Sequence, residues 1–304
     1  MYFVTFLKEN AERVGVLTAD RQRVICLGCA EHEFFGSSAI PATMREIIEQ
    51  QDSALPKIQK VCKQAAASPS AKAILDLRNL TVKAPYKNPP RNILCVGLNY
   101  HAHLREFEQA IGAAHAAPQF PILFSKPWTA IADPNTSIDG HASETNCYDY
   151  EIELAVIIGK DGKNISKEKA YDHVFGYSII NDLSARDLQR RSSQWYSGKC
   201  LDESAPFGPY LVHKSAIADP HNLNLRCTIN GEVRQDSNTQ LMIFDIPTII
   251  AAVSNGATIQ AGDIIATGTC SGVGTSFNPP KFLRRGDEMV LEIENIGILR
   301  NTLR

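Results

Sequence analysis

Three acidic residues, Glu151, Glu153 and Asp182, have the types and spacing that could bind a metal ion. Glu151 and Glu153 alternate at the start of an apolar run, 152–158, which predicts a buried strand. Alternate side chains of a strand point to one face, so these two carboxylates are expected about 7 Å apart. A second apolar run, 174–180, leads to Asp182 and places a third carboxylate at a strand end.

These carboxylates allow two interpretations. If they are buried, leaving them unpaired costs several kcal/mol each, so a cation should lie among them. Three carboxylates without His or Cys suit a hard, oxygen-seeking ion such as Mg2+ or Mn2+. A Glu-x-Glu pair on an edge strand is instead typical of a solvated face. The apolar run after the pair and the later Asp182 raise the weight of the metal interpretation, but spacing alone does not decide between the two.

The composition is that of an ordinary globular protein. The chain has 304 residues, of which 44% are hydrophobic and 21% charged, and a net charge of -2. This length allows one or two domains, and this charge argues against nucleic acid or an anionic membrane as partner. No apolar run approaches the ~20 residues of a membrane span, and the N-terminus lacks the basic region of a signal peptide. We therefore expect a cytoplasmic protein with a small-molecule substrate.

The eight cysteines are scattered, and reduced thiols are the default without a secretion signal. Cys26 and Cys29 have the spacing of a redox or zinc motif, but no second Cys pair accompanies them. They do not predict a zinc site.

The elements around the acidic residues predict an α+β protein that is mostly β. Residues 1–84 have the patterns of three short strands and two helices, which indicates a small N-terminal α+β domain before a proline-rich linker. Residues 85–304 are rich in short strands, which predicts a β domain rolled around a site. Asn230-Gly231 predicts a hairpin, and the glycine-rich turn 267–274 could present N–H groups to an anion.

His103 and Glu106 are three residues apart in a segment that predicts a helix, so they share a face of it. A histidine oriented by a carboxylate is a candidate general base, although from spacing alone a surface pair is the more usual interpretation. The stretch 107–121 is polar and alanine-rich, and 101–121 is predicted to be a mobile lid because few large apolar anchors offset its ordering entropy.

Taken together, the motifs resemble those of the fumarylacetoacetate hydrolase family, in the family's order, from about residue 91 to 302. They are Val96-Gly-Leu-Asn-Tyr100 with His103 and Glu106, Phe124-Ser-Lys-Pro127, Asp149-Tyr-Glu-Ile-Glu-Leu154, Asn181-Asp-Leu-Ser-Ala-Arg-Asp-Leu-Gln189, Gln194-Trp195, Gly198-Lys199, Phe207-Gly-Pro209, Thr267-Gly-Thr269 to Gly274, and the 286–297 strand.

The resemblance implies a mixed β-sandwich roll as the catalytic domain and a homodimer. It makes Glu151, Glu153 and Asp182 the ligands of Mg2+, with Mn2+ or Ca2+ as alternatives. It further implies that His103 and Glu106 activate water and that Lys199 lies near the substrate oxygens. Arg186, Gln189 and Thr269 match groups near bound substrate. Cys270-Ser271 and Leu201 depart from the family pattern and affect specificity rather than the metal site.

The family's reactions share a 2-oxo acid substrate. Because His103 and Glu106 are both present, we favour an acylpyruvase-type hydrolase that cleaves a C–C bond in a β-diketo acid such as fumarylpyruvate or maleylpyruvate, in the breakdown of aromatic compounds. A 2-oxo acid decarboxylase or an isomerase of 2-hydroxy-diene-dioates is the alternative, and a non-catalytic binding protein is the alternative from another class. We expect the far end of the substrate to be read by the lid, Arg105 and residues 190–195.

Overall fold

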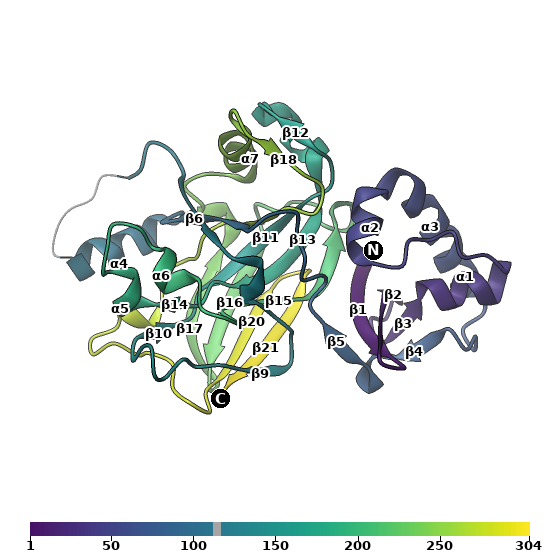
Figure 1. Ribbon diagram of the computed structural model, residues 1–304, viewed down its shortest axis with the longest axis horizontal. Helices are drawn as coiled ribbons and strands as arrows, with labels where there is room; N and C mark the ends of the chain where they lie inside the picture. Colours follow the sequence, from purple (N-terminus) through teal and green to yellow (C-terminus); the bar gives the residue numbers. More distant parts are fainter. Residues whose placement is uncertain (112–116) are drawn as a thin grey trace.

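The computed structural model describes residues 1–111 and 117–304, which form two lobes (Figure 1). Within these residues one 12-stranded sheet runs through both lobes in the order β4-β3-β2-β1-β15-β13-β11-β19-β6-β7, with β5 on β1 and β8 on β15. Its strands are β1 Tyr2–Lys8, β2 Ala11–Leu17, β3 Arg23–Cys26, β4 Ile74–Asp76, β5 Thr81–Lys83, β6 Ile93–Gly97, β7 Ile122–Lys126, β8 Ile131–Ala132, β11 Ile152–Ile158, β13 Val174–Asn181, β15 Ala205–His213 and β19 Ile264–Ala266.

A five-stranded sheet, in the order β17-β16-β20-β21-β9, packs against the central strands of the large sheet. One hydrophobic core joins the two sheets, since Val156 and Ile179 of the large sheet belong to the same buried cluster as Leu225 and Leu291 of the small one. The strands are β9 Thr136–Ile138, β16 Asn224–Ile229, β17 Glu232–Asn238, β20 Glu288–Ile293 and β21 Gly297–Leu303. The predicted α+β class, mostly β, with two packed sheets is confirmed.

The helices range from 4 residues in α5 and α6 to 17 residues in α3, and they lie around the sheets. They are α1 Leu27–Phe35, α2 Met44–Glu49, α3 Gln51–Ala67, α4 His101–Ile111, α5 Arg186–Gln189, α6 Tyr196–Lys199 and α7 Ile246–Ser254. The 3-10 helices are η1 Leu77–Asn79, η2 Trp128–Ala130, η3 Lys167–His173, η4 Lys214–Ala216, η5 Thr239–Leu241 and η6 Gly274–Ser276. Two further two-stranded ribbons pair β10 Tyr148–Asp149 with β14 Ser184–Ala185, and β12 Gly162–Lys163 with β18 Thr258–Ile259.

The N-terminal residues share both sheet and core with the rest of the chain. Strand β1 pairs antiparallel with β15, and the Phe3 ring lies 5.8 Å from that of Phe175. The same buried cluster contains Ile47 of α2 and Phe207 of β15. The two lobes are therefore packed together, and the division into domains at residue 84 stays a prediction.

Several local predictions can be compared with the structure. The hairpin at Asn230-Gly231 is confirmed, and both residues have positive φ values, 51° and 81°, as a type I′ turn requires. The sequence patterns missed α1, which begins directly after Cys26. Helix α4 continues through Ile111, into the polar and alanine-rich stretch 107–121 of the predicted lid. The central part of the predicted lid, 112–116, lies outside the described residues.

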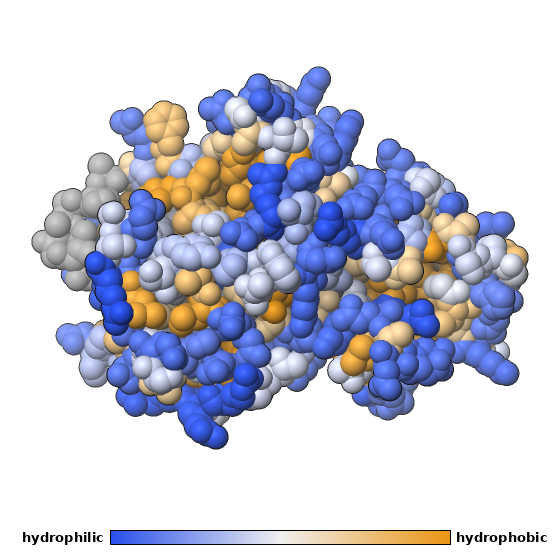
Figure 2. Space-filling model, in the orientation of Figure 1, coloured by the Kyte–Doolittle hydropathy of each residue, from blue (hydrophilic) through white to orange (hydrophobic). Residues whose placement is uncertain are grey.

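Hydrophilic side chains dominate the outline of both lobes in the space-filling view, and patches of hydrophobic side chains are visible on both (Figure 2). Among the described residues, no helix is at once long enough and apolar enough to cross a membrane. The predicted homodimer is not tested by a single chain.

Candidate active site

The pairing of β11 with β13 brings the three predicted acidic residues together. These strands are antiparallel with Ile152 opposite Asn181, and the N–H of Asp182 donates to the carbonyl of Glu151 at 2.9 Å. One carboxylate oxygen from each of Glu151, Glu153 and Asp182 lies within 4.8 Å of the others. Their exposed fractions are 4%, 1% and 0%, so the interpretation as a solvated face is excluded.

Buried cations pair with two of these carboxylates. The ammonium of Lys199 lies 2.7 Å from an oxygen of Glu151 and 2.7 Å from an oxygen of Asp182. Lys126 contacts the other oxygen of Asp182 at 2.9 Å, and the Nη2 of Arg186 contacts Glu151 at 2.7 Å. The sequence predicted a cation among the acidic residues, and the structure places the side chains of Lys199, Lys126 and Arg186 there.

The three carboxylates differ in how their charge is balanced. Burial by itself would raise the pKa of Glu151, but the charges of Lys199 and Arg186 hold that pKa below its ordinary value. Burial raises the pKa of Glu153, and the negative charges of Asp182 and Glu151 raise it further. Among the described residues Glu153 forms no ion pair, and its carboxylate accepts a hydrogen bond of 2.8 Å from the N–H of Gly268. The cluster is therefore short of positive charge at Glu153.

This arrangement fits a divalent cation. The donors are carboxylate oxygens without nitrogen or sulfur, as Mg2+ and Mn2+ prefer. The uncompensated charge of Glu153 is the observation that favours such an ion, because an ion among the three carboxylates would neutralise it. Glu151, Glu153 and Asp182 would hold such an ion, next to the ammonium of Lys199, which already contacts Glu151 and Asp182.

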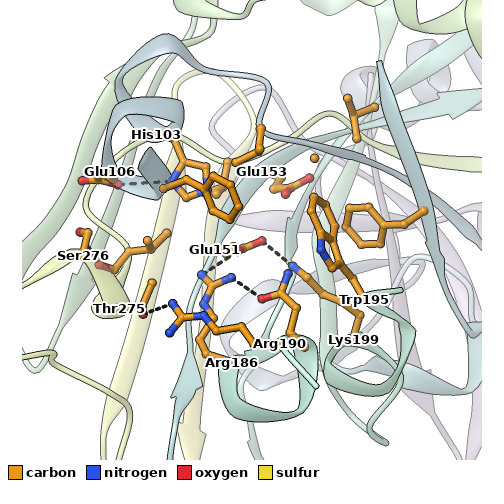
Figure 3. Close-up of a pocket in the computed structure, with 18 of the residues that line it drawn as sticks. His103, Glu106, Glu151, Glu153, Arg186, Arg190, Trp195, Lys199, Thr275 and Ser276 are labelled. Carbon is orange, nitrogen blue, oxygen red and sulfur yellow. Dashed lines mark hydrogen bonds and ion pairs between the residues drawn. The ribbon is translucent and has the colours of Figure 1, made fainter. Parts of the chain in front are cut away.

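The acidic cluster opens into a cavity of about 250 Å³ (Figure 3). Glu151, Glu153 and Lys199 lie in its wall, and Asp182 lies behind them with no exposed surface. Trp195 closes one side, where its ring meets Phe124 at 5.4 Å between centroids. A Cβ atom at Gly97 would lie 2.3 Å from the Trp195 ring, so the wall needs glycine there.

His103 and Glu106 from α4 face the same cavity (Figure 3). The His103 Nδ1 lies 3.2 Å from one oxygen of Glu106, and the other oxygen accepts a hydrogen bond of 2.8 Å from the N–H of Gly272. His103 is 9% exposed, whereas His101 is exposed. The pair therefore belongs to the cavity and is not a solvated surface contact.

The glycine-rich turn binds the protein's own carboxylates. The N–H groups of Gly274 and Thr275 donate to Asp149 at 2.6 and 3.0 Å, and that of Gly272 donates to Glu106. We expected this turn to present N–H groups to a bound anion, and these three groups already have acceptors. The turn thus positions Glu106 and Asp149.

The three predicted substrate-binding residues all line the cavity. Arg186 holds Gln189 through a hydrogen bond of 3.1 Å between Nη1 and Oε1. The Thr269 hydroxyl donates to the carbonyl of Ile152 and accepts from Gln235, so it is engaged within the protein. Their roles toward a substrate stay predictions.

Only some of the residues that we expected to recognise the far end of the substrate line the cavity. Arg190, Ser192 and Trp195 line the cavity. Arg105 and Arg191 do not line it. All three arginines are exposed, so Arg190 differs from the other two in lying in the cavity wall and not in burial.

Asp149 and Lys126 are site residues whose importance the sequence did not indicate. Asp149 is fully buried and contacts the Nε of Arg186 at 2.8 Å, so it orients the guanidinium that holds Glu151. Lys126 is fully buried against Asp182, and burial lowers its pKa in spite of that neighbour. Both residues lie in motifs quoted above, but no spacing rule joins them to their partners.

The family described as "Fumarylacetoacetate (FAA) hydrolase C-terminal" matches residues 92–304. The chain is 41% identical over 306 residues to "Oxaloacetate tautomerase YisK" of Bacillus subtilis (strain 168), covering 100% of both chains. It is 40% identical over 264 residues to "Oxaloacetate tautomerase FAHD2A, mitochondrial" of Homo sapiens, covering 86% of this chain and 80% of that one.

Two solved structures have the same fold. The fumarylacetoacetate hydrolase of the psychrophilic Exiguobacterium antarcticum superposes with a TM-score of 0.77 at 36% identity, covering 100% of this chain and 99% of that one. The maleylpyruvate hydrolase of Sphingobium sp. SYK-6, in complex with manganese(II) and pyruvate, superposes with a TM-score of 0.76 at 27% identity, covering 100% and 98%.

Proposed function

Because this chain belongs to the fumarylacetoacetate hydrolase family, we propose that it is an oxaloacetate tautomerase that requires a divalent cation, Mg2+ or Mn2+. The observation that carries the proposal is that the buried acidic cluster and the His103–Glu106 pair face one small cavity. The names of the relatives from Bacillus subtilis and Homo sapiens support oxaloacetate as the substrate. This proposal replaces the acylpyruvase favoured from the sequence.

The cavity suits a small acid. Its volume of about 250 Å³ lies below the usual range of about 300–1,000 Å³ for ligand pockets. A cation bound by Glu151, Glu153 and Asp182 would supply positive charge to the carboxylate and keto oxygens at the head of a 2-oxo acid. Burial alone would lower the pKa of Lys199, but Asp182 and Glu151 raise it above its ordinary value, so Lys199 stays a fixed positive charge beside those oxygens.

Tautomerisation moves one proton between C3 and the oxygen on C2, and it needs no co-reactant. In the tautomer that donates its Nδ1–H to Glu106, the Nε2 of His103 carries the lone pair that accepts the proton from C3. Glu106 stabilises the imidazolium that forms, and its own orientation is fixed by the N–H of Gly272. His103 then gives the proton to the C2 oxygen, where Lys199 has stabilised the developing negative charge.

A C–C hydrolase acting on an acylpyruvate is the second candidate. The specific observation in its favour is that the His103–Glu106 pair could equally activate a water molecule. The likeness to the maleylpyruvate hydrolase of Sphingobium supports it through the fold. Hydrolysis of an acylpyruvate consumes water and releases pyruvate, whereas tautomerisation forms only an isomer of its substrate, so product analysis separates the two reactions.

The test measures the conversion of enol-oxaloacetate to the keto form by ultraviolet absorbance with Mg2+. We expect His103→Gln to lower kcat by about 10²- to 10⁴-fold, the usual contribution of a general base. His101→Gln is the matched control, because His101 is exposed two residues away on α4. If wild-type protein does not accelerate the conversion above Mg2+ alone, the proposed function is wrong.

A further inference from the structure

Arg190 lines the cavity, and no carboxylate among the described residues forms an ion pair with it. The other two basic side chains in the wall are paired, Lys199 with Glu151 and Asp182, and Arg186 with Asp149 and Glu151. For Arg190 no ion pair is found within residues 1–111 and 117–304. Its Nη2 donates to the hydroxyl of Thr275 at 2.9 Å, so the guanidinium is held in place by a neutral group.

The backbone around Arg190 is fixed to the frame of the acidic cluster. Arg190 follows α5 directly, and its N–H donates to the carbonyl of Arg186. Thr275, which holds its guanidinium, donates its own N–H to Asp149, the residue that orients Arg186. Figure 3 shows Arg190 beside Thr275, on the side of the cavity away from Lys199. The cavity therefore holds both the acidic cluster and, beside Thr275, a guanidinium without an ion pair among the described residues.

We infer that Arg190, positioned by Thr275, binds the second carboxylate of a dicarboxylic 2-oxo acid and makes the site selective for dicarboxylates. This inference rests on the proposed function for the head of the substrate. A guanidinium has five N–H donors, of which Thr275 engages one group, so donors remain for a bidentate contact to a carboxylate. The alternative, a solvated surface charge, predicts no effect on substrate preference.

Loss of the contact between Arg190 and the second carboxylate should weaken the preference of the site for dicarboxylates. A hydrogen bond to a charged group typically changes an equilibrium by about 10- to 100-fold. Because the contact is to a part of the substrate that does not react, its loss should raise KM more than it lowers kcat. Loss of Thr275's hydroxyl should weaken the same contact less, because the charge remains.

The experiment compares oxaloacetate with 2-oxobutanoate, which has a methyl group in place of the distal carboxylate. Exchange of the C3 hydrogens with deuterated solvent, followed by NMR with Mg2+, measures enolisation of both. We expect Arg190→Met to lower kcat/KM for oxaloacetate by about 10- to 100-fold and to leave that for 2-oxobutanoate nearly unchanged. Arg190→Lys should recover part of the preference. Arg191→Met is the matched control, because Arg191 is exposed and outside the cavity wall.

Calorimetry gives a second readout that does not depend on turnover. With Mg2+ present, oxalate should bind Arg190→Met as tightly as wild type, whereas oxaloacetate should bind it more weakly. If wild type binds both acids but does not enolise oxaloacetate, the proposed function fails and the binding ratio still tests Arg190. If Arg190→Met changes neither the ratio of kcat/KM values nor the ratio of affinities, the inference is overturned.

Discussion

Replacing Asp149 with Asn should destabilise the protein strongly, because Asp149 is a fully buried carboxylate with four donors around it. They are the Nε of Arg186 at 2.8 Å and the N–H groups of Gly274, Thr275 and Tyr150 at 2.6, 3.0 and 3.0 Å. An Asn side chain keeps one acceptor oxygen and turns an NH2 group toward the donors of the other oxygen. Each buried donor left unpaired costs about 1–3 kcal/mol.

The charge adds to this cost. Breaking a buried ion pair typically costs about 3–5 kcal/mol, although Arg186 would keep Glu151 as a partner. We therefore expect Asp149→Asn to lower the free energy of unfolding by about 3–5 kcal/mol, and the melting temperature by roughly 10 °C.

Urea unfolding in the absence of metal, followed by circular dichroism, measures this difference. Asp236→Asn is the matched control, since Asp236 pairs with Arg226 at 2.8 Å but is 54% exposed. Such surface pairs contribute less than about 1 kcal/mol. If the two variants are equally stable, the buried contacts of Asp149 do not hold the site together and the reasoning is wrong.

Two further predictions concern charge at other positions. Glu153→Gln should abolish the thermal stabilisation by Mg2+, because it removes one of the three carboxylates. The metal-free variant should be at least as stable as the wild type, because the lost carboxylate is buried without an ion pair among the described residues. Loss of folding would contradict this prediction. Burial lowers the pKa of His213 from 6.5 to about 4. Between these pH values the unfolded state binds a proton that the folded state does not bind. The free energy of unfolding should therefore fall as the pH decreases from about 6.5 toward 4. In melts across this range His213→Gln should show a shallower decrease, and an unchanged slope would exclude this histidine as a cause.

The sequence by itself determined the local relations among the candidate site residues. The alternation of Glu151 and Glu153 on an apolar strand, and the position of Asp182 at the end of the next, made an acidic cluster one of two interpretations. The three-residue spacing of His103 and Glu106 predicted their contact, and Asn230-Gly231 predicted its hairpin. These predictions succeed because strand alternation, helix periodicity and turn geometry act over a few residues.

Only the tertiary structure decided which groups meet across the chain. Lys126 reaches Asp182, and Asp149 reaches Arg186 and the turn at Gly274, over separations for which no local pattern exists. The sequence could not distinguish Arg190 from Arg105 and Arg191 as the group that binds the far end of the substrate, because all three are arginines. The structure distinguishes them, because of these three only Arg190 lines the cavity. Burial and pairing set the charge balance of a site, and both arise only when distant strands pack together.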